Sequence, residues 1–272
     1  MPALRFAINH ITAPALPVSA LLELTRRLGL DAVEIRNDLP GVPLQDGSPA
    51  APIAAAARDA GVTILSVNAL QRFEDWSDAR ATEAVALADQ ARDSGARALV
   101  LVPTNSQQDT RSAEERAAGL RRALAALKPI LGERGLTGLV EPLGFAECAL
   151  RRKRLAVEAI DAIDGAALFS LVHDTFHHYV AGEAETFPDR TGLVHISGVE
   201  DASLPREAIR DAHRVLVGPG DLMDNIGQIR ALFAAGYTGP LSFEPFAESV
   251  HRLTGIAAAL SASIRYVRAC LG

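Results

Sequence analysis

The sequence predicts a single-domain (β/α)₈ barrel, or TIM barrel, that spans residues 1–272. Three observations support this prediction. The length is close to the ~250 residues typical of such a barrel. A unit made of an alanine- and leucine-rich stretch, a glycine and a short apolar run recurs along the chain. Polar residues follow many of the apolar runs, as they do where barrel strands end at an active site.

The apolar runs are predicted to be parallel strands. They are too short for helices, and their nearly continuous apolar character is typical of strands buried on both faces. The glycine before each run except the first is expected to end a helix, because glycine tolerates the left-handed backbone conformation. The predicted strands are Phe6–Asn9, Leu30–Ile35, Val62–Val67, Ala98–Val102, Leu139–Glu141, Phe169–Val172, Leu193–Ile196 and Leu241–Glu244.

The stretches between these strands are predicted to be helices. The connection between the sixth and seventh strands is the weakest, with room for only a short helix at Glu183–Pro188. Strict alternation is also typical of a doubly wound sheet, but no glycine-rich phosphate turn follows the first strand. The long irregular stretch Gly198–Gly220 is expected to be functional. The other predicted helices are Val18–Leu28, Pro52–Ala60, Ala79–Ser94, Ala113–Leu131, Leu155–Ile163, Leu222–Ala235 and Val250–Cys270.

Composition and charge exclude several classes of protein. The net charge of −6 argues against a nucleic-acid partner, which requires a basic surface. Cys148 and Cys270 form no metal-binding pattern and suit a reducing compartment. No apolar run is long enough for a membrane span, and Met1–Phe6 shows no signal-peptide pattern, so we expect a cytoplasmic protein. The alanine-rich helices leave homo-oligomerisation open.

Residues with metal-ligand chemistry lie at the ends of four consecutive predicted strands. Neighbouring barrel strands lie ~4.8 Å apart and end at the same rim, so these side chains are expected to converge. Three carboxylates so close together would raise one another's pKa values unless a cation lay between them. Three oxygen ligands and one imidazole suit one divalent ion, such as Mn²⁺, Mg²⁺, Co²⁺ or Zn²⁺. The predicted ligands are Glu141, Asp174, His195 and Glu244.

The segments around these residues resemble the xylose isomerase-like barrel superfamily, and the resemblance covers nearly the whole chain. Within it, the chain resembles the ketose 3-epimerases and, in more of its segments, the inositol-catabolism isomerase that acts on 2-keto-myo-inositol. The resemblance implies metal binding by the four predicted ligands and substrate contacts by His177 and Arg214. The segments that carry it are Val140-Glu141-Pro142, Asp174-Thr175-Phe176-His177, Val194-His195-Ile196, Phe243-Glu244-Pro245, Val33-Glu34-Ile35-Arg36, Asn68-Ala69-Leu70 and Arg214-Val215.

Two further residues are predicted to contact the substrate. Glu147 stands where ketose 3-epimerases of the superfamily have a substrate-contacting Glu and the inositol isomerase has a Gln, so the resemblance leaves both substrate classes open. Asn68 follows the third predicted strand and is expected to direct its neutral amide toward the site.

This set of residues predicts isomerisation of a small polyhydroxy ketone through an enediolate. The metal would bind the ketone oxygen and a neighbouring hydroxyl, and so stabilise the enediolate. Glu141 and Glu244 are the expected acid–base pair, because each can be both ligand and base on opposite sides of the substrate. Return of the proton to the adjacent carbon would move the carbonyl, and its return to the other face would epimerise the carbon.

Other functions are compatible with the same barrel. A lyase of the inosose dehydratase type would start from the same enolate and expel a β-hydroxyl group. Apurinic endonucleases of the endonuclease IV type use more histidines at the early strand ends, where this chain has Glu34, Arg36 and Asn68. A sugar-binding protein without turnover would not need the pair Glu141 and Glu244.

Overall fold

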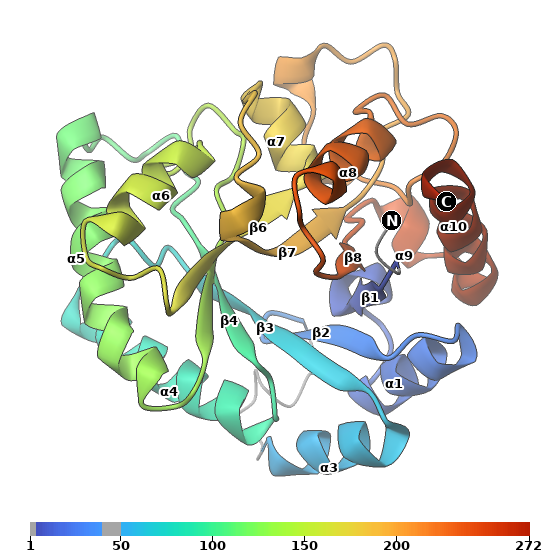
Figure 1. The fold of residues 1–272 in the computed structure, drawn as a ribbon, viewed down its shortest axis with the longest axis horizontal. Coiled ribbons are helices and arrows are strands. Elements are labelled where there is room, and N and C mark those ends of the chain that lie inside the picture. The colour runs from blue at the N-terminus through green and yellow to red at the C-terminus, as the bar shows by residue number, and fades with distance from the viewer. Residues whose placement is uncertain (1–3, 40–49) are drawn as a thin grey trace.

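Eight parallel strands close into a barrel in the order of the sequence (Figure 1), which confirms the predicted fold. The computed structural model describes residues 4–39 and 50–272. Met1–Ala3, part of the segment without a signal-peptide pattern, lie outside the described residues. The strands are β1 (Phe6–Asn9), β2 (Ala32–Arg36), β3 (Thr63–Gln71), β4 (Ala98–Val102), β5 (Thr137–Val140), β6 (Phe169–Asp174), β7 (Thr191–Ile196) and β8 (Leu241–Phe243).

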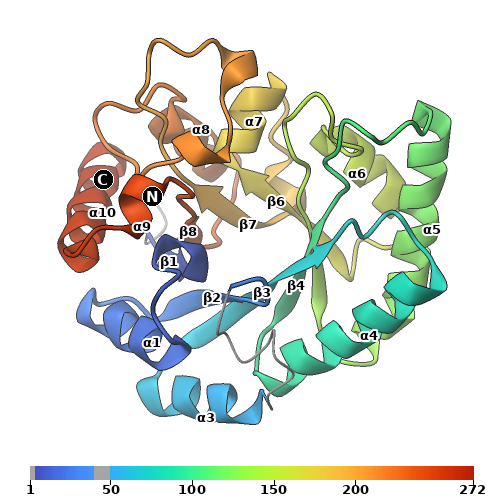
Figure 2. The same ribbon diagram turned by 180° about the vertical axis from the view of Figure 1, so that it is seen from behind.

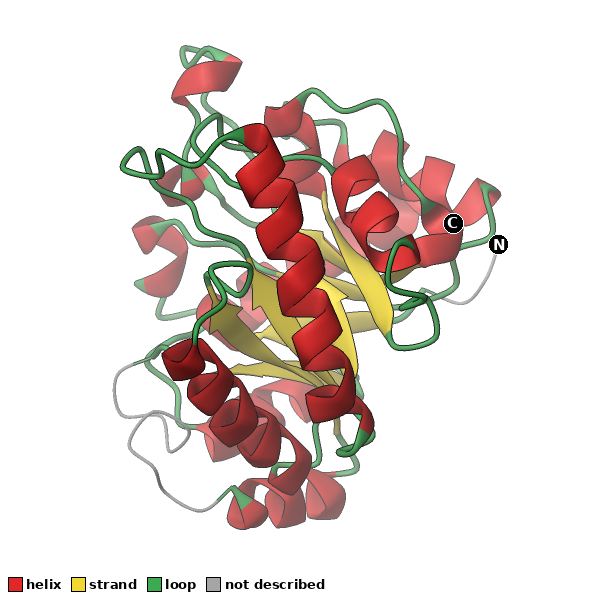
Figure 3. Ribbon diagram, turned by 90° about the vertical axis from the view of Figure 1, so that its left-hand side faces the viewer, coloured by secondary structure: helices red, strands yellow, loops and turns green. Residues whose placement is uncertain are grey.

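The helices surround the strands as an outer layer, which both end-on views show (Figure 2). Seen from the side, the strands lie inside and the helices outside (Figure 3). In the described residues, no helix combines the length and the hydropathy that a membrane span requires. The helices are α1 (Val18–Arg27), α3 (Ala51–Ala60), α4 (Asp78–Asp93), α5 (Ala113–Gly132), α6 (Lys153–Asp161), α7 (Thr175–Ala181), α8 (Asn225–Ala234), α9 (Glu248–His251) and α10 (Ile256–Leu271).

The connection between β6 and β7 differs from the prediction. The short helix expected at Glu183–Pro188 is absent there, and α7 instead begins directly after β6. The side chain of Asp174 caps α7 by accepting hydrogen bonds from two backbone N–H groups of its first turn. Gly182 ends the helix with a φ of 61°. An aspartate N-cap and a glycine C-cap therefore define this helix, and both signals are present in the sequence.

Alternation along each strand separates the barrel interior from the helix layer. In β7, Val194 and Ile196 belong to the large apolar cluster that the helices share. Leu193 belongs to a smaller cluster with Val100 and Leu139, which come from other strands. His195 has the same phase as Leu193, because side chains two residues apart in a strand point to the same face. It therefore points into the barrel, above the small cluster.

Candidate metal centre and active site

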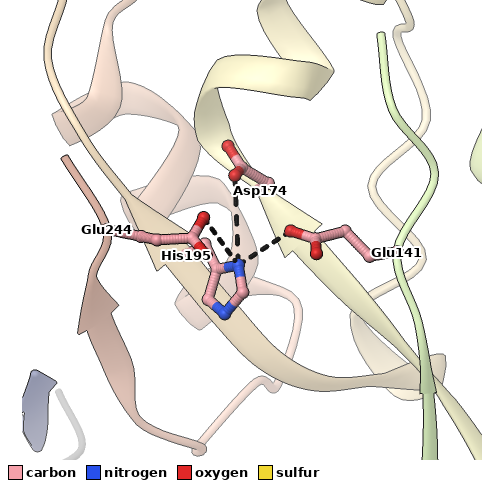
Figure 4. A group of neighbouring side chains, drawn as sticks. All are labelled: Glu141, Asp174, His195 and Glu244. Carbon is pink, nitrogen blue, oxygen red and sulfur yellow. Dashed lines mark hydrogen bonds and ion pairs between the residues drawn. The ribbon is translucent and has the colours of Figure 1, made fainter. Parts of the chain in front are cut away.

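Four side chains converge where strands β5 to β8 end. Glu141, Asp174, His195 and Glu244 are all buried, and one ligand atom from each lies within 4.8 Å of the others. The carboxylates face a single imidazole nitrogen, Nδ1 of His195 (Figure 4). The distances from Nδ1 are 2.8 Å to Glu141, 3.2 Å to Glu244 and 3.9 Å to Asp174. The structure thus brings together the four residues that the sequence predicts as ligands.

Backbone pairing fixes the position of each ligand. The backbone N–H of Glu141 donates to Leu101 of β4, and that of Glu244 donates to Ile196 of β7. Asp174 is the last residue of β6, and its Oδ1 caps α7 while its Oδ2 faces the other ligands. The two glutamates therefore extend the strand ladder by one residue, and the aspartate lies at a strand-to-helix junction.

The electrostatics of the cluster favour a cation. Burial raises the pKa of the Glu141 carboxyl, and Glu244 and Asp174 add to this rise, whereas His195 opposes it. Burial alone would lower the pKa of the His195 imidazole, but Glu244, Glu34 and Glu141 raise it well above its ordinary value. The raised pKa of His195 indicates that the buried carboxylates attract positive charge, although at Glu244 the effect of burial is outweighed by His195, Arg214 and Arg36, which lower the pKa of that carboxyl to about 2. Three carboxylates and one imidazole fit a divalent metal ion, which would supply that charge.

Arg214 holds two of the carboxylates in place. Its guanidinium group donates to Asp174 Oδ2 at 2.6 Å and to Glu244 Oε2 at 2.8 Å. The guanidinium carbon lies 4.8 Å from the ring centre of Phe176 and 4.7 Å from that of Phe246. Arg214 comes from the long loop after β7, which returns to the barrel through a backbone bridge between Gly198 and Val215. The loop is therefore part of the site, as the sequence predicts.

His177 presents one defined nitrogen to the site. Its Nδ1 accepts a hydrogen bond from the backbone N–H of Gly144 at 3.2 Å, so the proton of the neutral ring lies on Nε2. Position 144 requires glycine, because a Cβ atom there would lie 2.3 Å from the carbonyl oxygen of His177. Nε2–H of His177 is thus available as a donor to a ligand in the cavity that this residue lines.

A cavity of about 450 Å³ opens above the cluster. This volume lies in the range of small-molecule sites. Glu141 and Glu244 line the cavity, whereas Asp174 and His195 do not. Three of the predicted substrate-binding residues, His177, Arg214 and Asn68, also line the cavity, and Phe246 forms another part of its wall.

Glu147 is the one predicted site residue that the structure places elsewhere. It lines a separate, smaller cavity of about 260 Å³ together with Arg151 and Arg210. The described residues that line the larger cavity do not include it. Its contact with a substrate stays a prediction from the resemblance alone.

The sequence analysis assigned no role to Glu34 and Arg36, although both lie at the end of the second strand. Arg36 lines the cavity, donates to both carboxylate oxygens of Asp38 and contacts Glu244 at 3.3 Å. Glu34 is fully buried and contacts Nε2 of His195 at 3.1 Å. Their spacing could have identified them. Residues 34 and 36 share one face of a strand, so two charged side chains point toward the barrel interior.

Comparisons with known proteins agree with this fold. The sequence model of the xylose isomerase-like TIM barrel family matches residues 22–270. A xylose isomerase domain containing protein from Salmonella typhimurium LT2 has 32% sequence identity and a TM-score of 0.87, over 98% of this chain and 97% of that one. Among curated protein sequences, none matches.

Two further solved structures share the fold at lower identity. The IOLI protein, solved with a bound zinc atom, is 23% identical with a TM-score of 0.87, over 98% of both chains. An L-ribulose 3-epimerase is 21% identical with a TM-score of 0.76, over 98% of this chain and 94% of that one. The fold and the ligand cluster define a barrel with a candidate metal centre at its mouth. The chain belongs to the xylose isomerase-like TIM barrel family.

Proposed function

We propose that this protein is a divalent-metal-dependent isomerase of a small polyhydroxy ketone, with 2-keto-myo-inositol as the first candidate substrate. One observation carries the proposal. Of the four residues in the ligand cluster, only Glu141 and Glu244 also line the cavity. The site therefore offers two carboxylates that can contact a substrate directly while they share in binding one ion. Such a pair suits proton transfer between adjacent carbons of a ketone.

Glu141, Asp174, His195 and Glu244 would hold the metal. When bound, the metal supplies positive charge that stabilises an enediolate, and Mn²⁺, Mg²⁺, Co²⁺ and Zn²⁺ all fit this donor set. The zinc atom of the IOLI structure supports a metal in this fold. The metal dependence is part of the proposal.

The protein's own residues would move the protons on the two reacting carbons. One carboxylate of the pair Glu141 and Glu244 takes a proton from the carbon next to the ketone, and the resulting electron pair delocalises into the enediolate. The other carboxylate gives a proton to the former ketone carbon, and the hydroxyl proton passes from its enediolate oxygen to the former ketone oxygen, so that the carbonyl moves by one position. His177 donates from Nε2–H to a substrate oxygen, and Arg214 keeps Glu244 in place through its hydrogen bond. Asn68 donates to Glu34, and its amide oxygen faces no donor among the described residues, so it is free for a substrate hydroxyl.

The far side of the substrate would contact the ends of β3 and β4. The cavity wall there includes Gln71, Arg72 and Asn105. No hydrogen bond or ion pair to their side chains is found within residues 4–39 and 50–272. Arg72 also has a φ of 51°, a conformation that non-glycine residues adopt at a cost and that gathers at functional sites. These uncommitted polar groups would bind the remote hydroxyls of the ketone.

We expect the Arg72→Gln variant to raise KM about tenfold with little change in kcat, because it removes a charged hydrogen bond made equally in the ground and transition states. Steady-state kinetics at saturating metal would measure this. The matched control is Arg97→Gln. Arg97 is exposed and lies just before the first residue of β4, at the end of the barrel away from the cavity. A KM that changes equally in both variants would remove Arg72 from the site.

Hydrogen exchange with solvent tests the proposed reaction. Metal-loaded protein would be incubated in D₂O with 2-keto-myo-inositol and, separately, with fructose, tagatose and psicose. Deuterium in an inosose with a new ketone position, observed by NMR, supports the proposal. Exchange at C3 of a hexulose would make the protein a ketose 3-epimerase, and loss of water would make it a lyase of the dehydratase type. No exchange with any of the four, at full metal occupancy, would refute the proposed function.

The remaining expectations about partners follow from this reaction. The partner is a small polyhydroxy ketone, with neither nucleic acid nor membrane. Glu34, Arg36 and Asn68 occupy the early strand ends, which agrees with a site for one ion rather than for the larger ligand set of a nuclease. A homo-oligomer and a cytoplasmic location stay predictions.

A further inference from the structure

A carboxylate lies directly behind the predicted metal ligand His195. Glu34, in β2, has no exposed surface and lies on the opposite side of the imidazole ring from the three carboxylates of the ligand cluster. Its carboxylate contacts Nε2 of His195 at 3.1 Å through Oε1 and at 3.2 Å through Oε2. Nδ1 of His195 faces the other three ligands, and Glu34 contacts Nε2, the ring nitrogen that faces away from them.

Neutral donors surround the rest of the Glu34 carboxylate. Ser66 donates to Oε2 at 2.6 Å, and Asn68 donates to the same oxygen at 2.9 Å. Ser242 and Asn9 donate to Oε1. A carboxyl group that receives this many donors is an ionised acceptor, because a protonated one would turn a donor of its own toward them. Glu34 is therefore the acceptor in its contact with His195, and the proton of the imidazole must lie on Nε2.

We propose that Glu34 is a positioning residue that fixes His195 as the Nε2–H tautomer, so that the lone pair on Nδ1 points at the metal ion. A neutral imidazole carries its proton on either nitrogen, and only one of the two tautomers can bind a metal through Nδ1. The hydrogen bond to Glu34 selects that tautomer, holds the ring plane and increases the basicity of Nδ1. Glu34 itself does not touch the substrate cavity. This inference rests on the metal site of the proposed function.

The same carboxylate connects three parts of the site. Asn9 donates to Oε1 of Glu34 at 3.4 Å and to Oε1 of Glu244 at 3.1 Å. Asn68 donates to Glu34 and also lines the substrate cavity. A change at Glu34 would thus disturb a metal ligand, an acid–base residue and a substrate contact together, although Glu34 contacts neither the metal position nor the cavity.

Metal affinity without substrate tests the proposal. In Glu34→Gln, an NH₂ group replaces one acceptor oxygen. Because both oxygens accept hydrogen bonds in the wild type, the NH₂ group must face other donors in either orientation of the amide. We expect Mn²⁺ to bind this variant about 10- to 100-fold more weakly than the wild type, as measured by titration calorimetry on the full chain. The matched control is Ser66→Ala, which removes one donor to the same carboxylate but keeps its charge and the contact with His195. It should change the affinity far less than Glu34→Gln.

A second measurement needs only the wild-type protein. In ¹⁵N-labelled protein loaded with Zn²⁺, NMR of the imidazole nitrogens should show the proton of His195 on Nε2. A proton on Nδ1, or a Glu34→Gln variant that folds and binds Mn²⁺ with wild-type affinity, would overturn the proposal. Both measurements are independent of turnover. If the protein binds metal as expected but exchanges no hydrogen in any ketone, the proposed function fails and the role of Glu34 stands.

Discussion

Glu141→Gln and Glu244→Gln should each lower kcat by roughly a thousandfold, which is within the range of a lost general acid or base. An amide cannot accept the proton from carbon, while its size leaves the cavity nearly unchanged. The measurement is steady-state turnover of the ketone that the D₂O experiment identifies, at a metal concentration high enough to saturate each variant. That condition matters because both residues also belong to the ligand cluster.

Glu248→Gln is the matched control for these two variants. Glu248 lies four residues after Glu244, and its side chain is 72% exposed and paired with Arg252. It should keep wild-type turnover. A metal-saturated Glu141→Gln or Glu244→Gln variant with more than a tenth of the wild-type kcat would show that proton transfer is performed by another group.

Metal binding should stabilise the fold substantially. At a metal concentration about 100 times the dissociation constant, binding to the native state adds ~2.7 kcal/mol to the free energy of unfolding. For a chain of this size that corresponds to a rise in Tm of roughly 5–10 °C. Treatment with a chelator should remove both this rise and the enzymatic activity, and added Mn²⁺ should restore them. Thermal denaturation followed by circular dichroism measures the first effect.

Asp174→Asn makes this prediction specific to the cluster. The asparagine side chain can still cap α7 through its oxygen, so the helix that carries His177 should persist. The variant loses one charged ligand, and the rise in Tm on adding Mn²⁺ should be much smaller than in the wild type. Each protein is compared with its own metal-free form. An unchanged rise would place the metal somewhere other than at this cluster.

Most of the barrel follows from local signals in the sequence. The glycines at positions 29, 61, 95, 135 and 236 all have positive φ, as expected where each ends a helix. Gly165 and Gly192, for which the same conformation was expected, do not have positive φ. Gly192 lies inside β7, where a Cβ atom would come within 2.9 Å of Leu139. There the requirement for glycine comes from packing inside the barrel. Local sequence rules describe helix ends well but contain no information on such contacts.

The ligand cluster was predictable for a similar reason. Once the strands are aligned in parallel, their last residues must meet at one rim, so Glu141, Asp174, His195 and Glu244 converge. The contacts of Glu34 depend on the side-chain phase of β2 and on the packing of Ser66 and Ser242 around it. Two serines and a glutamate in separate strands form no recognisable sequence motif, because they come together only when the barrel closes.

Asp174 differs from the other two carboxylates in how freely it could change during evolution. Glu141 and Glu244 are each followed by proline, and neither caps a helix, so a change of side-chain length there would leave the neighbouring helix ends unaffected. Asp174 uses Oδ1 for the first turn of α7 and Oδ2 for the cluster. An extra methylene would move both oxygens at once, loosening the helix that carries His177 while changing the ligand geometry. A change of one methylene in side-chain length that keeps the charge should therefore be tolerated less at Asp174 than at Glu141 or Glu244.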